Sequence, residues 1–205
     1  MTPSRFVRPV RSKRRVLRCI GPVALLLLAG TAAHATTLVH LGTAQLADRS
    51  ELIVRGTVTG TESRMHAEHR FPYTYISLRV DEVFKGNAVF PGQTVLLQEL
   101  GGSVGETRCV VDAVPSFLPG EDVLVFLETG PEGNYRTYGM VQGKFSFQRD
   151  SRTGGLLLTR PPDLFGATLV ASEEAGDLTP ARTDGNYEAE PLLATLRSLR
   201  ARGWE

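Results

Sequence analysis

The chain has 205 residues, with 23 basic and 22 acidic side chains and a formal net charge of +1. Seven of the basic residues, and none of the acidic ones, lie before residue 19, so the remainder carries 16 basic against 22 acidic side chains. Nucleic acids and anionic membranes are bound by a concentrated basic surface, whereas the remaining basic residues are scattered singly. The composition therefore argues against both as partners.

The first part of the chain has the layout of an export signal. An arginine-rich start precedes an apolar stretch at 20–29 and then Ala33-His34-Ala35. This order predicts a secretory signal peptide over 1–35, cleaved after Ala35. The apolar stretch is too short to span a bilayer, which takes roughly 20 residues. We therefore expect a periplasmic or extracellular protein without a stable membrane span after cleavage. Arg14-Arg15 leaves the twin-arginine route open beside the general secretory route.

Two cysteines occur in the chain, Cys19 within the expected signal and Cys109 in the body. Cleavage would leave one thiol and hence no internal disulfide, so the fold must be held by its hydrophobic core. About 170 residues suffice for one such domain. Cys109 lies in a strand-like segment at 107–111, which favours a buried small apolar residue over a reactive thiol.

Strand-like segments dominate the mature chain after a short helical stretch near 43–48. They are rich in β-branched and aromatic residues, are bounded by Gly, Pro, Asn or Asp, and cover 52–59, 73–84, 94–100, 107–111, 122–127, 135–141, 144–148 and 156–158. The segment 122–127 is an almost continuous apolar run and is predicted to be the most buried strand. Glycines at 101–105 predict a flexible loop, and 150–155 predicts a hairpin turn. Short strands separated by regular turn signals indicate an all-β sandwich or barrel.

The C-terminal part has a different composition. Residues 161–190 are rich in Pro, Gly and acidic residues, which predicts an irregular connector after a β-barrel domain at 36–160. A helix is expected over 191–205, because its leucines fall on one face: Leu192, Leu193, Leu196 and Leu199. This amphipathic helix either docks on the barrel, which is the commoner role, or recruits a partner.

Two segments resemble the start of netrin-like domains, the group that includes the tissue inhibitors of metalloproteinases. They are Leu46–Val58, an aspartate-containing entry into a strand, and Val80–Gly86, a strand that ends in a hydrophobic-Lys-Gly turn. The chain is more similar still to exported bacterial proteins that share its Gly-Gly and Gln-Gly-Lys-Phe segments. The likeness covers about 46–147 and implies an OB-type five-stranded barrel. The inhibitors use a disulfide-pinned N-terminal cysteine, whereas cleavage here exposes Thr36, so the resemblance supports the fold better than protease inhibition.

The segment Met65–His69 contains the only local cluster of metal-capable side chains, His66 and His69, expected between the first two strands. The spacing is not the His-Glu-x-x-His zinc signature, and no third ligand is indicated. Solvated histidines are therefore favoured and no metal site is predicted. A metal-dependent hydrolase built on His66 and His69 is the alternative, and it would need His40 and a carboxylate from elsewhere in the fold.

Other catalytic and cofactor signals are absent from the sequence. Gly101–Gly105 lacks the Gly-Lys-Ser/Thr ending of a phosphate loop. It matches Gly-x-Ser-x-Gly formally, but a nucleophile elbow needs a strand-to-helix turn, and here strand follows strand. Asp81 and Glu82 point to opposite faces of a strand and cannot form an acid–base pair by themselves. No catalytic residue and no cofactor are predicted.

A binding surface is the remaining hypothesis. OB-type barrels bind ligands on a strand face or between rim loops, and four tyrosines are candidate aromatic platforms: Tyr73, Tyr75, Tyr135 and Tyr138. The same tyrosines are also ordinary strand residues. Arg55, Arg79 and Lys144 are expected to be solvated charges. The sequence thus predicts an exported, non-enzymatic binding or accessory module with an exported protein as its possible partner. An envelope assembly protein and a protease inhibitor are further alternatives.

Overall fold

The computed structural model describes residues 37–160, 168–170 and 176–204. The expected signal peptide, its cleavage point after Ala35 and Cys19 lie outside the described residues. The chain divides into two units, 1–34 and 35–205, and every described residue belongs to the second. Within the described part, no helix is long and apolar enough to cross a membrane.

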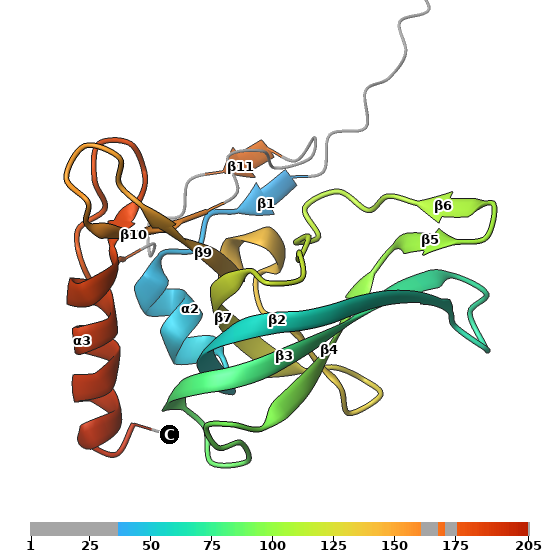
Figure 1. The fold of residues 1–205 in the computed structure, drawn as a ribbon, viewed down its shortest axis with the longest axis horizontal. Coiled ribbons are helices and arrows are strands. Elements are labelled where there is room, and N and C mark those ends of the chain that lie inside the picture. Colours follow the sequence, from blue (N-terminus) through green and yellow to red (C-terminus); the bar gives the residue numbers. More distant parts are fainter. Residues whose placement is uncertain (1–36, 161–167, 171–175, 205) are drawn as a thin grey trace, which may run out of the picture. The chain divides into compact units, whose positions relative to one another are not determined.

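Five strands of the described part form a ring that is closed by hydrogen bonds (Figure 1). They are β2 (Leu52–Met65), β3 (Pro72–Lys85), β4 (Thr94–Leu100), β7 (Asp122–Thr129) and β8 (Tyr135–Thr137). The order around the ring is β2, β3, β4, β8, β7 and back to β2, with every pair antiparallel except β4 and β8. A ring of five strands around a hydrophobic core is barrel-like. The predicted all-β fold with minor α content is confirmed.

Two of the ring strands are longer than expected. β2 and β3 have 14 residues each, beyond the predicted segments 52–59 and 73–84. Their pairing shifts register between Arg55 and Gly56. A Cβ at Gly56 would lie 2.4 Å from the carbonyl oxygen of Arg79, so only glycine lets the two backbones approach this closely. The long hairpin carries its connecting turn, 66–71, to one end of the ring.

Further strands extend the sheet from the edge of β7 that also pairs with β8. β9 (Lys144–Arg149) pairs with β7, β10 (Leu156–Thr159) pairs with β9, and β12 (Tyr187–Glu188) pairs with β10. The predicted hairpin turn closes β9 onto β10, with Asp150 N donating to Gly155 O at 2.8 Å. The sheet therefore presents a broad outer surface on which helices can pack.

Two short two-stranded sheets complete the described strands. β5 (Gly102–Val104) and β6 (Thr107–Cys109) form a hairpin where the sequence predicted a flexible glycine loop. β1 (Thr37–Val39) pairs in parallel with β11 (Thr168–Val170), which lies within the expected connector. Parts of that connector, 161–167 and 171–175, lie outside the described residues.

The predicted strand at 135–141 ends early. β8 stops at Thr137, and a 3-10 helix, η1 (Met140–Gly143), follows. The reason is the backbone: Gly139 has a φ of 69° and Met140 a φ of 58°, so two successive left-handed residues turn the chain away from the sheet. At Gly139 a Cβ would also come within 2.8 Å of Leu41.

The described residues pack into two main cores, one inside the ring and one between the outer sheet surface and the helices. β7 contributes residues to both cores. Val123, Val125 and Leu127 point into the ring. Leu124 and Phe126 point to the helices. All five are fully buried, which confirms the prediction for this strand. A continuous apolar run results because both faces of β7 are covered.

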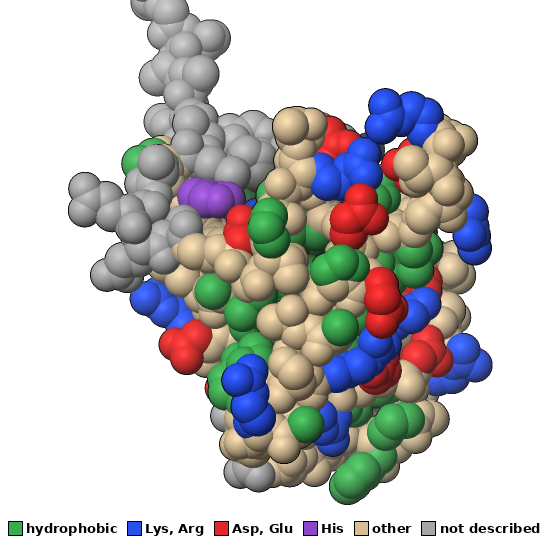
Figure 2. Space-filling model, turned by 90° about the vertical axis from the view of Figure 1, so that its left-hand side faces the viewer, with side chains coloured by type: hydrophobic (Ala, Val, Ile, Leu, Met, Phe, Trp, Pro, Cys, Tyr) green, Lys and Arg blue, Asp and Glu red, His purple; other side chains and the backbone are tan. Residues whose placement is uncertain are grey.

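Two helices cover the second core, α2 (Thr43–Arg49) and α3 (Ala189–Ala201). The buried face of α3 consists of Ala189, Leu192, Leu193 and Leu196. Arg197 on the outer face pairs with Glu82 of β3 at 2.7 Å. Figure 2, which views this side, shows basic and acidic side chains interspersed. The apolar face of the C-terminal helix is thus buried in the domain.

The described end of the connector also contacts α2. Asp177 Oδ1 accepts hydrogen bonds from Thr43 N at 2.8 Å and from the Tyr187 hydroxyl at 3.0 Å. Thr43 Oγ1 in turn accepts from Leu178 N at 2.8 Å. These bonds fix the residues before β12 against the helix, so this stretch is ordered despite its polar composition.

The expectation that Lys144 is a solvated charge is wrong. Its side chain is 4% exposed, and Nζ donates to Glu121 Oε1 at 2.7 Å and to Ser116 O at 2.6 Å. Burial lowers the pKa of Lys144. Burial would raise the pKa of Glu121, but hydrogen bonds from Lys144, Ser146 and Leu118 N outweigh it and lower that pKa. Arg79 is exposed, whereas half-buried Arg55 pairs with Asp122 at 2.6 Å.

Leu193→Ala should lower the free energy of unfolding by about 2–5 kcal/mol, because it removes buried methyl groups from the second core. Leu118→Ala is the matched control: Leu118 is 69% exposed, and its change should stay within about 0.5 kcal/mol. Urea denaturation measures both. Equal effects would show that the face of α3 is not part of the core.

Lys144→Met should destabilise the fold by about 3 kcal/mol, because it leaves Glu121 without the cation that compensates its partial burial. Arg79→Met removes a more exposed cation, 55% accessible at its side chain, and should have little effect. Urea denaturation at neutral pH compares the free energies of unfolding of the two variants. A loss for Lys144→Met no greater than for Arg79→Met would contradict the role of the buried ion pair.

Candidate functional site

The pairing between β8 and β4 is the shortest strand pairing in the ring. These strands share a single bridge pair, Leu97 with Tyr135. β4 continues to Leu100, whereas β8 ends at Thr137 and the residues after it turn away from the sheet. We call the opening between them the seam cleft; it has a volume of about 400 Å³. Its lining comes from β3, β4, β7, the 66–71 turn, the segment between β6 and β7, the 130–134 loop and β8 with the residues after it. The lining residues are His69, Tyr73, Gln98, Glu99, Leu100, Val114, Glu128, Gly130, Pro131, Glu132, Asn134, Arg136, Thr137, Gly139 and Met140.

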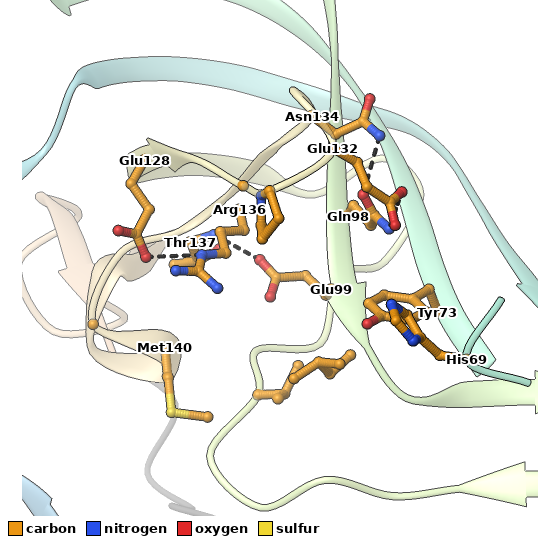
Figure 3. Close-up of a pocket in the computed structure, with 15 residues that line it drawn as sticks. His69, Tyr73, Gln98, Glu99, Glu128, Glu132, Asn134, Arg136, Thr137 and Met140 are labelled. Atoms are coloured by element: carbon orange, nitrogen blue, oxygen red, sulfur yellow. Dashed lines mark hydrogen bonds and ion pairs between the residues drawn. The ribbon is translucent and has the colours of Figure 1, made fainter. Parts of the chain in front are cut away.

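Glu99 is the central polar side chain of the seam cleft. It is only 7% exposed and extends from β4 toward β8 (Figure 3). Its Oε1 accepts a hydrogen bond from Thr137 N at 2.8 Å, so the carboxylate takes the place of a backbone acceptor where the strands diverge. The Thr137 hydroxyl, which is buried and has no other hydrogen-bond partner in the described part of the chain, interacts with the same carboxylate.

Burial raises the pKa of Glu99 to about 7. Hydrogen bonds from the side chain and the backbone N–H of Thr137 and the charge of Arg136 act in the opposite direction, and the charge of Glu128 reinforces the rise. Arg136 itself is engaged by Glu128, with Nε donating to Oε1 at 2.9 Å. Near neutral pH the Glu99 carboxyl is therefore poised between its neutral and charged forms.

A second cleft, of about 280 Å³, lies against the same part of β4. It shares Glu99, Leu100 and Val114 with the seam cleft and is otherwise lined mainly by the β5–β6 hairpin and the chain after it. Cys109 lines this second cleft; it is half-buried and free, not fully buried as the sequence suggested. Glu99 therefore stands in the wall that the two clefts share.

The histidines are placed in the hairpin turn, as predicted, but they are not simply solvated. The rings of His66 and His69 stack with centroids 4.6 Å apart, and the His66 ring lies 5.3 Å from that of Tyr73. His66 Nε2 contacts Glu132 of the 130–134 loop. The turn is thereby joined to the loop across the mouth of the seam cleft.

The described residues provide no third ligand for a metal ion at these histidines. No group of three or more His, Cys, Asp or Glu side chains there is arranged to hold a metal ion. His40, the additional ligand that such a site would have needed, donates its backbone N–H to Val170 O beside the β1–β11 pair. The structure thus brings His66 and His69 together without His40.

Side-chain amides fix the loop to the sheet. Gln98 Nε2 donates to Glu132 Oε2 at 3.0 Å, and Asn134 Nδ2 donates to Gln98 Oε1 at 3.0 Å. The hydrogen bond from Gln98 and then the contact with His66 lower the pKa of Glu132. These bonds hold the rim of the cleft in one arrangement.

The four candidate tyrosines do not form one surface. Tyr73 lines the seam cleft. Tyr75 lies on the same face of β3, opposite Gln98, with the Arg64 guanidinium 5.5 Å from its ring. Tyr135 instead packs against the core of the ring, and Tyr138 against the second core. The structure therefore brings Tyr73 and Tyr75 together and separates the other two from them.

Strained backbone accompanies the clefts. Met140, which lines the seam cleft, and Ala113, the neighbour of Val114, have positive φ angles of 58° and 61°. The two segments are joined by a hydrogen bond from Val141 N to Ala113 O of 2.8 Å. Left-handed conformations cost energy for residues other than glycine and cluster at functional sites.

The sequence reasoning missed the central residues of this site, Glu99, Thr137 and Arg136. One signal was present: Val95, Leu97 and Glu99 share the inward face of β4, so a carboxylate follows two core positions. Leucines on both faces of this strand concealed the alternation. Thr137 and Arg136 had no comparable signal, because their role depends on where β8 leaves the sheet.

No protein-family model matches the chain, and no curated protein matches it either. The functional conclusion therefore rests on the geometry and chemistry of the cleft.

Glu99→Gln should make the protein more stable above neutral pH. The folded pKa lies above the unfolded value, so ionisation of Glu99 opposes folding and wild-type stability falls as pH rises through about 7. Glutamine keeps the acceptor for Thr137 N without the charge. The stability difference between variant and wild type should grow between about pH 5 and pH 8 by up to about 3 kcal/mol. Urea denaturation across this range measures it, and a pH-independent difference would contradict the buried ionisation.

Proposed function

We propose that the protein is an exported binding module and that the seam cleft is its ligand site. One observation carries the proposal. OB-type barrels bind ligands on the second and third strands of the ring and at the loops that join the first strand to the second and the fourth to the fifth. In this ring these elements are β3, β4, the 66–71 turn and the 130–134 loop, and residues of all four line the cleft.

The size and chemistry of the cleft support the same conclusion. Ligand sites are concave, have volumes of about 300–1,000 Å³, and combine apolar walls with a few oriented polar groups. The seam cleft falls in this range. Its apolar residues include Leu100, Pro131 and Met140, and its central polar group is Glu99 (Figure 3).

The rim is held in place before any ligand arrives. His66 and Gln98 both engage Glu132, and Asn134 engages Gln98. A rim that is already ordered reduces the entropy lost on binding. This arrangement suits a binding module whose partner enters a preformed site, and the netrin-like resemblance that we propose for the barrel is compatible with such a role.

The hydrolase alternative has less support. It requires a metal centre around His66 and His69, whereas the described residues offer no third ligand there. The carboxylate nearest to His66 is Glu132, which already accepts a hydrogen bond from Gln98. Binding without catalysis is therefore the function that the geometry favours.

A ligand screen by protein-observed nitrogen-15 NMR tests the proposal on the mature chain. Compounds from a set that includes sugars, amines and short peptides should shift amide signals of Tyr73, Gln98–Leu100 and Asn134–Met140 together. Val114→Trp should suppress the shifts, because a larger side chain at this position fills the shared wall of the clefts.

Leu118→Trp is the matched control, since Leu118 is exposed and lines neither cleft. It should leave the shifts unchanged. The proposal fails if the hits cluster on another surface, or if they persist in a folded Val114→Trp variant.

A further inference from the structure

We infer that the seam cleft binds an alkylammonium group, placed against the carboxylate of Glu99. This inference rests on the proposed function and specifies its ligand class. A lysine side chain of a peptide and a free alkylamine both present this chemistry, and the experiment below separates the two sources.

Glu99 forms no ion pair with the described residues. A buried carboxylate is normally paired with a cation or fully hydrogen-bonded. Here the backbone N–H and the hydroxyl of Thr137 both interact with the Glu99 carboxylate, but no described residue forms an ion pair with it. The buried Thr137 hydroxyl of the same cleft keeps a lone pair that can accept from a ligand. A buried carboxylate without a cation, next to a second acceptor, fits a cationic ligand that brings several donors.

The number of free oxygens distinguishes between cations. A guanidinium is best bound by both oxygens of one carboxylate, in a planar, two-pronged pair. Glu99 has already committed Oε1 to Thr137 N. An ammonium is a compact charge with three donors that can be directed to separate acceptors, so it needs a single carboxylate oxygen. The geometry therefore favours an ammonium over a guanidinium.

The charges around Glu99 allow a cation to enter. From β7 and β8, Glu128 and Arg136 face the cleft as a mutual pair with 2.9 Å between Oε1 and Nε. From the loop, Glu132 adds a carboxylate. From the turn, His69 lines the cleft and His66 contacts Glu132. On the side of the second cleft the titratable or charged groups are Arg108 and Cys109. In the seam cleft three carboxylates thus face one guanidinium.

The walls suit the methylene chain that carries an ammonium. Leu100, Val114, Pro131 and Met140 supply apolar surface to the cleft. Long amines bury their methylene groups along such surface while the charged end seeks polar partners. In this cleft the polar partner is the buried Glu99 carboxylate, so the charged end would point inward.

The test compares N-acetyl-Ala-Lys-Ala-amide with N-acetyl-Ala-Gln-Ala-amide by NMR titration of the mature protein. At pH 8 the lysine peptide should bind and shift Glu99, Leu100 and Thr137, and the glutamine peptide should bind at least tenfold more weakly. Because burial raises the pKa of Glu99 to about 7 and lysine stays charged, affinity should fall about tenfold from pH 8 to pH 6.

Glu99→Gln should weaken binding of the lysine peptide at pH 8 at least tenfold and remove its dependence on pH. Glu106→Gln is the matched control, because Glu106 is exposed in the β5–β6 turn and lines neither cleft. It should leave affinity unchanged. n-Butylamine distinguishes the source: binding as tight as that of the peptide supports a free amine, and tighter binding of the peptide supports a lysine side chain.

Equal binding of the two peptides, or tighter binding at pH 6, would overturn the ammonium inference. If other compounds still shift the cleft residues, the proposed function stands and the ligand is of another class. If neither the peptides nor any compound of the screen shifts them, the proposed function fails as well.

Discussion

The closure of the ring at β8 is the constraint on which the rest of the site depends. Three residues of β8 join β4 to β7, with a single bridge pair to β4. After Thr137 the left-handed Gly139 and Met140 take the chain out of the sheet, so the backbone ladder stops and the Glu99 carboxylate accepts the next amide. One short strand therefore produces both the opening of the barrel and the buried acid inside it.

The remainder of the domain holds that seam in position. Both faces of β7 pack against a hydrophobic core, and this packing fixes the strand with which β8 pairs. Two lysines act as internal braces: Lys144 anchors the chain before β7 through Glu121, and Lys85 donates to the last carbonyls of α2, Ala47 O and Asp48 O. Burial lowers the pKa of both lysines. The hydrophobic-Lys-Gly turn and the Gln-Gly-Lys-Phe segment of the sequence are thus structural motifs.

The sequence predicted the elements whose burial follows from the pattern of neighbouring residues. The clearest cases are the apolar run 122–127 of β7, which is buried on both faces, and the leucines on one face of α3. Such patterns could not predict features made by residues distant in sequence. Lys144 looks like any strand-face charge until Glu121, 23 positions earlier, is folded beside it. The contact of His66 with Glu132 spans 66 positions. Nor does the sequence reveal that Met140 adopts a left-handed conformation, which decides where β8 ends and hence where the cleft opens.

The proposed site depends on Glu99 being a buried carboxyl group at the seam without a cationic partner among the described residues. Carbon-13 NMR titration of the glutamate carboxyl signals in the mature protein, with Glu99→Gln to assign the resonance, tests it most directly. We expect a Glu99 midpoint near pH 7, with the signals of Leu100 and Thr137 following the same titration. A midpoint close to the ordinary value of about 4.5 would show that the carboxyl is solvated. The seam would then lack the buried acid on which the proposed site is built.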